Sequence, residues 1–244
     1  MKRISILVVF VMLASFAFAQ KSRDNALSKK EKKEGWVLLF DGKSTDNFRG
    51  YGKQEFPKGW IIDNGAIKCN GSGRGEAGAK DGGDIITKEQ YQNFELSLEW
   101  KISQGGNSGI FILGQEVAGE PIYMSSPEMQ VLDNDRHPDA KLGRDGNRQA
   151  GSLYDLIPAN PQNAKPVGDW NKVVITVYKG TVIYNQNGKN VVEYHLWTDE
   201  WKTMVKDSKF KDWPRFIDPA EKGYIGLQDH GDDVWYKNIK LKVL

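Results

Sequence analysis

Short strand-like runs separated by turn signals constrain the fold of this chain most strongly. Residues 94–102 alternate between apolar and polar side chains, which places Phe94, Leu96, Leu98, Trp100 and Ile102 on one face of a strand. Asp63-Asn64-Gly65 separates two further short runs and is a strong hairpin signal. About a dozen such runs with Gly and Asn turns predict an all-β antiparallel sandwich or jelly roll.

One segment departs from the strand pattern. Residues 197–210 carry large apolar side chains near helical spacing, and Trp213-Pro214 ends the run. We expect a short helical insertion near 197–210. It either plugs the edge of the core or covers one end of a groove.

The first residues predict a targeting segment. A basic start, an apolar run over 4–18 and Ala17-Phe18-Ala19 are typical of a signal peptide at 1–19. The run is shorter than the about 20 apolar residues that a membrane span needs. We therefore expect an exported protein, periplasmic or secreted, without a membrane span after cleavage. A retained anchor is the alternative.

The rest of the chain reads as a tether and one domain. Residues 20–34 are rich in Lys and lack apolar periodicity, which predicts a solvated tether, and 35–244 are enough for one large β domain. A formal net charge of +2 gives no support to nucleic-acid binding. Cys69 is the single cysteine, so an internal disulfide and a Cys metal site are excluded.

Two stretches carry candidate site residues. In the first, we expect strands at 224–230 and 234–243 around the turn at 231–233, with Gln228 and His230 on one face. In the second, Glu128 and Gln130 share a face of a strand, and Asp133 joins them only through a bulge. The alternatives are a histidine satisfied by backbone groups at a turn and an edge strand with a polar outer face.

Other combinations of polar residues remain open. His137, Asp133 and Asp135 could form a metal site with His230, although neither an HExxH nor an EF-hand pattern occurs. Glu128 with Asp133 or Asp155 could supply the two carboxylates of ordinary glycoside hydrolysis. The absence of GxSxG removes support for a serine hydrolase.

Glycines and aromatic residues add two further expectations. Residues 71–83 form a glycine-rich loop, and long loops often carry binding residues. Most aromatic side chains in a sandwich pack in its core, and we expect Trp100 and Trp170 there.

Several linked motifs together resemble a known family. They occur in this order: GWVLLFDGK (35–43), WIIDNG (60–65), GNSGIF (106–111), EMQVLDN (128–134), GDWN (168–171) and GLQDHG (226–231). The chain resembles the 3-keto-disaccharide hydrolase domain family, also described as 3-keto-glucoside 1,2-lyase/hydratase, over about 35–244. The resemblance implies a concanavalin A-like jelly roll and action on glycosides oxidised at C3. One departure is Ile112-Leu113-Gly114-Gln115-Glu116, where many members have an aromatic residue or Arg, and it bears on substrate size.

The resemblance also implies residue roles. A C3 ketone acidifies the proton on C2, so a base can remove it and the C1 substituent leaves by β-elimination; water then adds for net hydrolysis. We expect His230 as the base or a metal ligand and Glu128 as a metal ligand or the acid/base partner. A divalent cation could stabilise the enediolate, and no organic cofactor is expected. The expected substrate-binding residues are Gln130, Gln228, Asn107 and Asp133.

Two other functions remain possible for this chain. A conventional glycosidase of this fold uses Glu-x-Asp-x-x-Glu, whereas here Gln130 replaces the middle acid of the stretch from Glu128 to Asp133. A non-catalytic carbohydrate-binding module is the second alternative. The expected partners are a carbohydrate substrate and sugar 3-oxidoreductases that make the 3-keto sugar.

Overall fold

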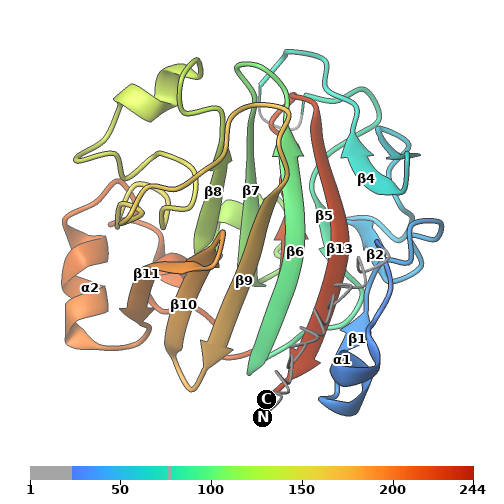
Figure 1. Cartoon of the computed structure of the whole chain (residues 1–244). Helices are drawn as coiled ribbons and strands as arrows, with labels where there is room; N and C mark the ends of the chain where they lie inside the picture. Colours follow the sequence, from blue (N-terminus) through green and yellow to red (C-terminus); the bar gives the residue numbers. More distant parts are fainter. Residues whose placement is uncertain (1–23, 76–77) are drawn as a thin grey trace, which may run out of the picture.

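Two antiparallel sheets pack face to face in the computed structural model, which describes residues 24–75 and 78–244 (Figure 1). The eight-stranded sheet has the order β11 (Lys189–His195), β10 (Thr181–Gln186), β9 (Asn171–Tyr178), β6 (Phe94–Ile102), β13 (Val234–Val243), β4 (Ala66–Cys69) and β3 (Trp60–Asp63), with β1 (Val37–Leu38) beside β13. The five-stranded sheet has the order β2 (Phe48–Gly50), β5 (Ile85–Thr87), β12 (Tyr224–Leu227), β7 (Asn107–Gly114) and β8 (Glu128–Leu132). The predicted concanavalin A-like jelly-roll sandwich is confirmed.

The core lies between the two sheets. Strand β6 turns Phe94, Leu96 and Trp100 inward, and each is at most 1% exposed. Burial of such side chains is the main favourable contribution to folding. Trp170 does not join this core. It is partly exposed, and the ammonium groups of Lys101 and Lys237 lie 5.2 and 4.4 Å from its ring centre.

The predicted hairpin at Asp63-Asn64-Gly65 joins β3 and β4. Asn64 and Gly65 both adopt positive φ, at 49° and 77°, as a two-residue hairpin turn requires.

The hairpin expected at 224–243 does not form. Strand β12 pairs with β5 and β7 in the small sheet, whereas β13 pairs with β4, β6 and β1 in the large sheet. The turn around Gly231 therefore carries the chain from one sheet to the other. Strand β12 ends at Leu227, so Gln228 and His230 lie on the crossing segment and not within a strand.

The expected helical insertion is present beside the sandwich. It contains α2 (Asp199–Lys206) and the short α3 (Pro214–Ile217). Thr198 caps α2 by accepting a hydrogen bond from the backbone N–H of Trp201. Trp201 stacks between Tyr194 of β11 and Phe216 of α3, with ring centres 5.6 and 5.8 Å away. Two 3₁₀ turns, η1 (Ile122–Met124) and η2 (Pro138–Lys141), lie on either side of β8 in the sequence.

The N-terminal segment contacts β13. Within the tether predicted at 20–34, residues 24–34 are described and contain α1 (Lys29–Lys33). Glu31 pairs with Lys240 at 2.5 Å, and the backbone N–H of Asn25 donates to Asn238 over 2.6 Å. These contacts hold the segment against the sheet. The signal peptide predicted at 1–19 lies outside the described residues. Within the part that is described, we find no helix with the length and apolar character of a transmembrane span.

Candidate functional site

A cavity of about 230 Å³ opens between the small sheet and the helical insertion. Strands β7 and β8, the segment after β12 and the insertion all contribute side chains to it. The lining residues are Asn107, Tyr123, Ser126, Glu128, Gln130, Tyr154, Lys209, Phe210, Trp213, Phe216, Gln228 and His230. Five predicted site residues thus meet in one place: Asn107, Glu128, Gln130, Gln228 and His230.

Strand β8 carries Glu128 and Gln130 to the cavity on the same face, as the period of two predicts. Both are nearly enclosed, with exposed fractions of 8% and 1%. Gly109 on β7 pairs with Gln130, and a Cβ atom at Gly109 would overlap the Glu128 carboxylate. The glycine therefore leaves the space in which this carboxylate lies.

Strand β7 also fixes the segment that carries Gln228. The backbone N–H of Gln228 donates to the Gly109 carbonyl over 3.0 Å, and Ser108 Oγ donates to the Gln228 carbonyl over 2.7 Å. Asn107 and Ser126 lie close by and line the same cavity. The buried Asn107 Oδ1 and Ser126 Oγ atoms have no hydrogen-bond partner among the described residues. A polar ligand would satisfy them.

The buried carboxylate of Asp229 supports the site from behind. It accepts hydrogen bonds from the backbone N–H groups of Ala79, Gly83 and Gly231, the last two at 2.7 and 2.9 Å. The glycine-rich loop is therefore bound to the segment that presents Gln228 and His230. No residue of the loop's described part lines the cavity, which favours a supporting role.

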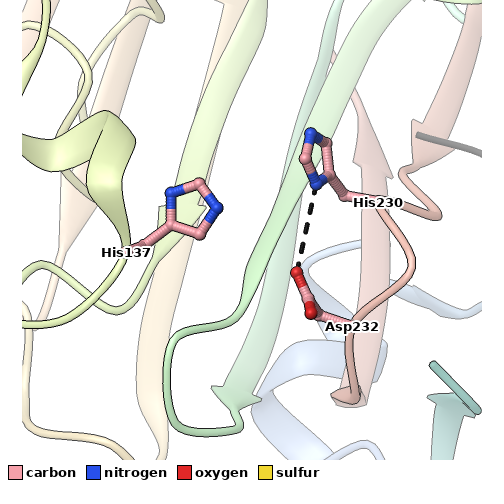
Figure 2. Close-up of side chains that lie close together, drawn as sticks. All are labelled: His137, His230 and Asp232. Atoms are coloured by element: carbon pink, nitrogen blue, oxygen red, sulfur yellow. Dashed lines mark ion pairs between the residues drawn. The ribbon is translucent and has the colours of Figure 1, made fainter. Parts of the chain in front are cut away.

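His230 faces His137 across the rim of the site (Figure 2). The two ring centres are 6.0 Å apart at 82°, and His230 Nδ1 lies 4.0 Å from Asp232 Oδ2. Burial lowers the pKa of His230, with a further lowering from His137, while Asp232 opposes the shift. The imidazole is therefore neutral near pH 7 and able to accept a proton. Asp232 is itself oriented by the backbone N–H of Asn107, at 3.0 Å.

His137, His230 and Asp232 form the one described cluster that could offer three metal ligands, with ligand atoms within 4.8 Å of one another. His137 does not suit that role. Its Nδ1 accepts a hydrogen bond from the backbone N–H of Asp139 at 3.2 Å, so the neutral ring carries its proton on Nε2. A ligating histidine instead donates from one nitrogen and binds metal through the other. Glu128 is not in the cluster, so these residues do not fit a resident metal ion.

Three predicted carboxylates lie away from the cavity. Asp133 follows β8 without a bulge and accepts hydrogen bonds from the backbone N–H groups of Gly105 and Asp135, at 2.7 and 3.1 Å. Asp155 binds Arg148 at 2.5 Å. The side chain of Asp135 is exposed. Neither Asp133 nor Asp155 lines the cavity beside Glu128.

The sequence did not single out the opposite wall. The insertion and its neighbours contribute Tyr123, Tyr154, Lys209, Phe210, Trp213 and Phe216. Of the two placements that the sequence allowed for the insertion, the structure shows the one in which it covers a groove. No local pattern distinguished Lys209 from the other lysines.

Comparison with known proteins places this chain in a family. Residues 35–242 match the 3-keto-alpha-glucoside-1,2-lyase-like domain. The chain belongs to this family. A Bacteroides thetaiotaomicron protein named 3-keto-disaccharide hydrolase is 56% identical over 229 residues, which are 86% of this chain and 79% of that protein.

Solved structures agree with the family fold. A candidate glycosyl hydrolase of Parabacteroides distasonis ATCC 8503 superposes with a TM-score of 0.80 and 29% identity, covering 91% of this chain and all of that one. A second one from the same organism has a TM-score of 0.65 and 26% identity, covering 86% and 99%. The predicted family resemblance is confirmed.

Proposed function

We propose that this protein cleaves 3-keto-glycosides by removing the C2 proton and eliminating the C1 substituent, with or without later hydration. Membership of the family and the name of the relative from B. thetaiotaomicron support a carbohydrate-cleaving enzyme. The elimination route is our interpretation of the cavity.

The observation that carries the proposal is the chemical content of the cavity. Among its described lining residues, Glu128 is the only carboxylate, and it accompanies one imidazole and several amides. Conventional glycosidases place two carboxylates about 5–10 Å apart around the scissile bond. Asp133 and Asp155 are bound elsewhere. Elimination beside a ketone needs one base and one acid partner, which this set supplies.

Five of the cavity residues then have roles. Neutral His230 accepts the proton from C2, the C2–H electrons form the C1=C2 bond, and the C1–O bond breaks. Glu128 in its acid form protonates the departing oxygen. Gln130, Gln228 and Asn107 bind sugar hydroxyls. Water adds across C1=C2 when the net result is hydrolysis.

The chemistry of the substrate implies which class of enzyme must produce it. A C3 ketone on a glycoside arises by oxidation of the C3 hydroxyl, so a sugar 3-oxidoreductase must act before this protein. From the signal peptide predicted at 1–19, we propose that the reaction takes place outside the cytoplasm, in the periplasm or the medium.

The test uses the purified protein with a 3-keto-glucoside and with its unoxidised parent. We expect enone absorbance and aglycone release from the keto form alone, and a loss of at least about a hundredfold in H230N and E128Q. H195N is the control because His195 is an exposed residue of β11. Cleavage of the parent would favour a conventional glycosidase. Binding without cleavage of either sugar would favour a carbohydrate-binding module.

A further inference from the structure

Lys209 is the only Lys or Arg among the described residues that line the cavity. It follows α2 and is held over the aromatic wall, with Nζ 4.1 Å from the ring centre of Tyr154 and 5.2 Å from that of Phe210. Its side chain is 38% exposed. These contacts hold the ammonium group against the aromatic wall of the cavity, where it keeps partial contact with solvent.

The ion pair that Lys209 makes with Asp155 is long. Asp155 Oδ2 is 3.9 Å from Nζ, whereas Asp155 Oδ1 binds Arg148 at 2.5 Å. Asp139 is likewise occupied by Arg148 and by the Tyr154 hydroxyl, both at 2.8 Å. Lys209 Nζ makes no hydrogen bond to another described residue, so its three N–H donors are available to a bound molecule.

The proposed elimination needs such a cation. When C2 loses its proton, negative charge moves to the ketone oxygen before the C1 substituent leaves. A fixed positive group beside that oxygen lowers the barrier in a partly dehydrated site. The histidine cluster does not fit a metal ion for this task, because His137 Nδ1 already accepts the Asp139 N–H.

Resting on the elimination chemistry proposed above, we propose that Lys209 binds the C3 oxygen of the 3-keto sugar and stabilises the enolate. No bond forms between the lysine and the sugar. The C2 proton goes to His230, the charge on the C3 oxygen pairs with the ammonium group, and its return expels the C1 substituent. Burial lowers the pKa of Lys209, with a further lowering from the nearby Arg148, while the carboxylate of Asp155 opposes this shift and favours the ammonium form.

The experiment compares K209M, K209Q and K209R with K211M, a control at an exposed lysine outside the cavity. With a 3-keto-glucoside, we expect K209M and K209Q to lose about 10²–10³ in kcat with little change in KM or Tm. K209R keeps the charge and should stay within about tenfold of the wild type. Exchange of the C2 proton in D₂O should fall in the two neutral variants alone, which a merely structural role would not produce.

The outcomes separate this inference from the proposed function. A wild-type protein that leaves the 3-keto-glucoside intact overturns both. A K209M variant as active as the wild type overturns the role of Lys209 and leaves the elimination proposal standing. An inactive K209R, together with a borohydride-trapped sugar adduct on Lys209, overturns the electrostatic role because the lysine then acts through an imine.

Discussion

The Nδ1 atom of His137 accepts a hydrogen bond from the backbone N–H of Asp139, 3.2 Å away. Asp139 is in turn held by Arg148 and Tyr154, each at 2.8 Å. This network fixes the Nε2–H tautomer of a neutral His137 and directs a donor toward His230 (Figure 2). The pair therefore does not offer two free imidazole lone pairs to a metal ion.

Chelation should leave the enzyme active. Because His137 offers no free lone pair in this arrangement, we expect incubation with EDTA and gel filtration to change kcat on a 3-keto-glucoside by less than about twofold. Metal content by mass spectrometry before and after treatment is the control. Loss of activity that Mn²⁺ or Zn²⁺ restores would contradict this prediction and would assign enolate stabilisation to a metal instead of Lys209.

The activity should depend on pH through His230. Burial lowers its pKa below the usual 6.5, so the base form persists to a lower pH than for a free imidazole. We expect kcat/KM to be level near pH 7 and to fall about tenfold per pH unit below the lowered pKa. D232N removes the carboxylate that opposes the shift and should move the acid limb to lower pH. An acid limb above pH 6.5, or one that D232N leaves in place, would refute His230 as the base.

Replacement of Gly109 should lower the activity by displacing the Glu128 carboxylate. A methyl group at this position overlaps the carboxylate, so G109A should displace it and reduce kcat by about a hundredfold. The double variant G109A/E128Q should be hardly worse than E128Q, since both changes act on one group. If the loss of kcat in the double variant were the product of the two single losses, Gly109 would act on a group other than Glu128. Circular dichroism and Tm measurements check that the sheet is retained.

Sequence reasoning identified local features better than their long-range arrangement. The period of two in β8 correctly placed Glu128 and Gln130 on one face, and the Asn64-Gly65 turn predicted its hairpin. The prediction of a hairpin at Gly231 was wrong. A tight polar turn has the same local sequence whether the strands on its two sides pair with each other or belong to different sheets. The sequence predicted the aromatic insertion but left open whether it plugs the core or covers a groove, and it did not identify Lys209. Both depend on how a distant insertion folds back onto the sandwich.

Replacement of Asp229 should weaken both the fold and the site. In D229N, an NH₂ group replaces one oxygen and faces backbone donors such as those of Gly83 and Gly231. Leaving such groups unsatisfied should lower the free energy of unfolding by about 1–3 kcal/mol. Urea denaturation measures this, with D212N as the exposed control. We also expect a lower kcat because Asp229 lies between Gln228 and His230. Unchanged stability would show that the glycine-rich loop does not depend on this carboxylate.

Asp84 should make stability fall as pH rises. The side chain of Asp84 is partly exposed, but its surroundings remove most of the water from the carboxyl group. This burial raises the pKa of the carboxyl to about 7, from about 3.8 in the unfolded chain. Between these values the folded protein binds more protons than the unfolded chain, so this group's contribution is complete below pH 4 and is lost as pH rises toward 7. D84N can still accept the backbone N–H of Asp229, which lies 2.9 Å from Asp84 Oδ1. Its Tm should therefore decline less than that of the wild type between pH 5 and pH 8. D81N, at an exposed position, should follow the wild type, and parallel curves for D84N and the wild type would exclude Asp84 as the titrating group.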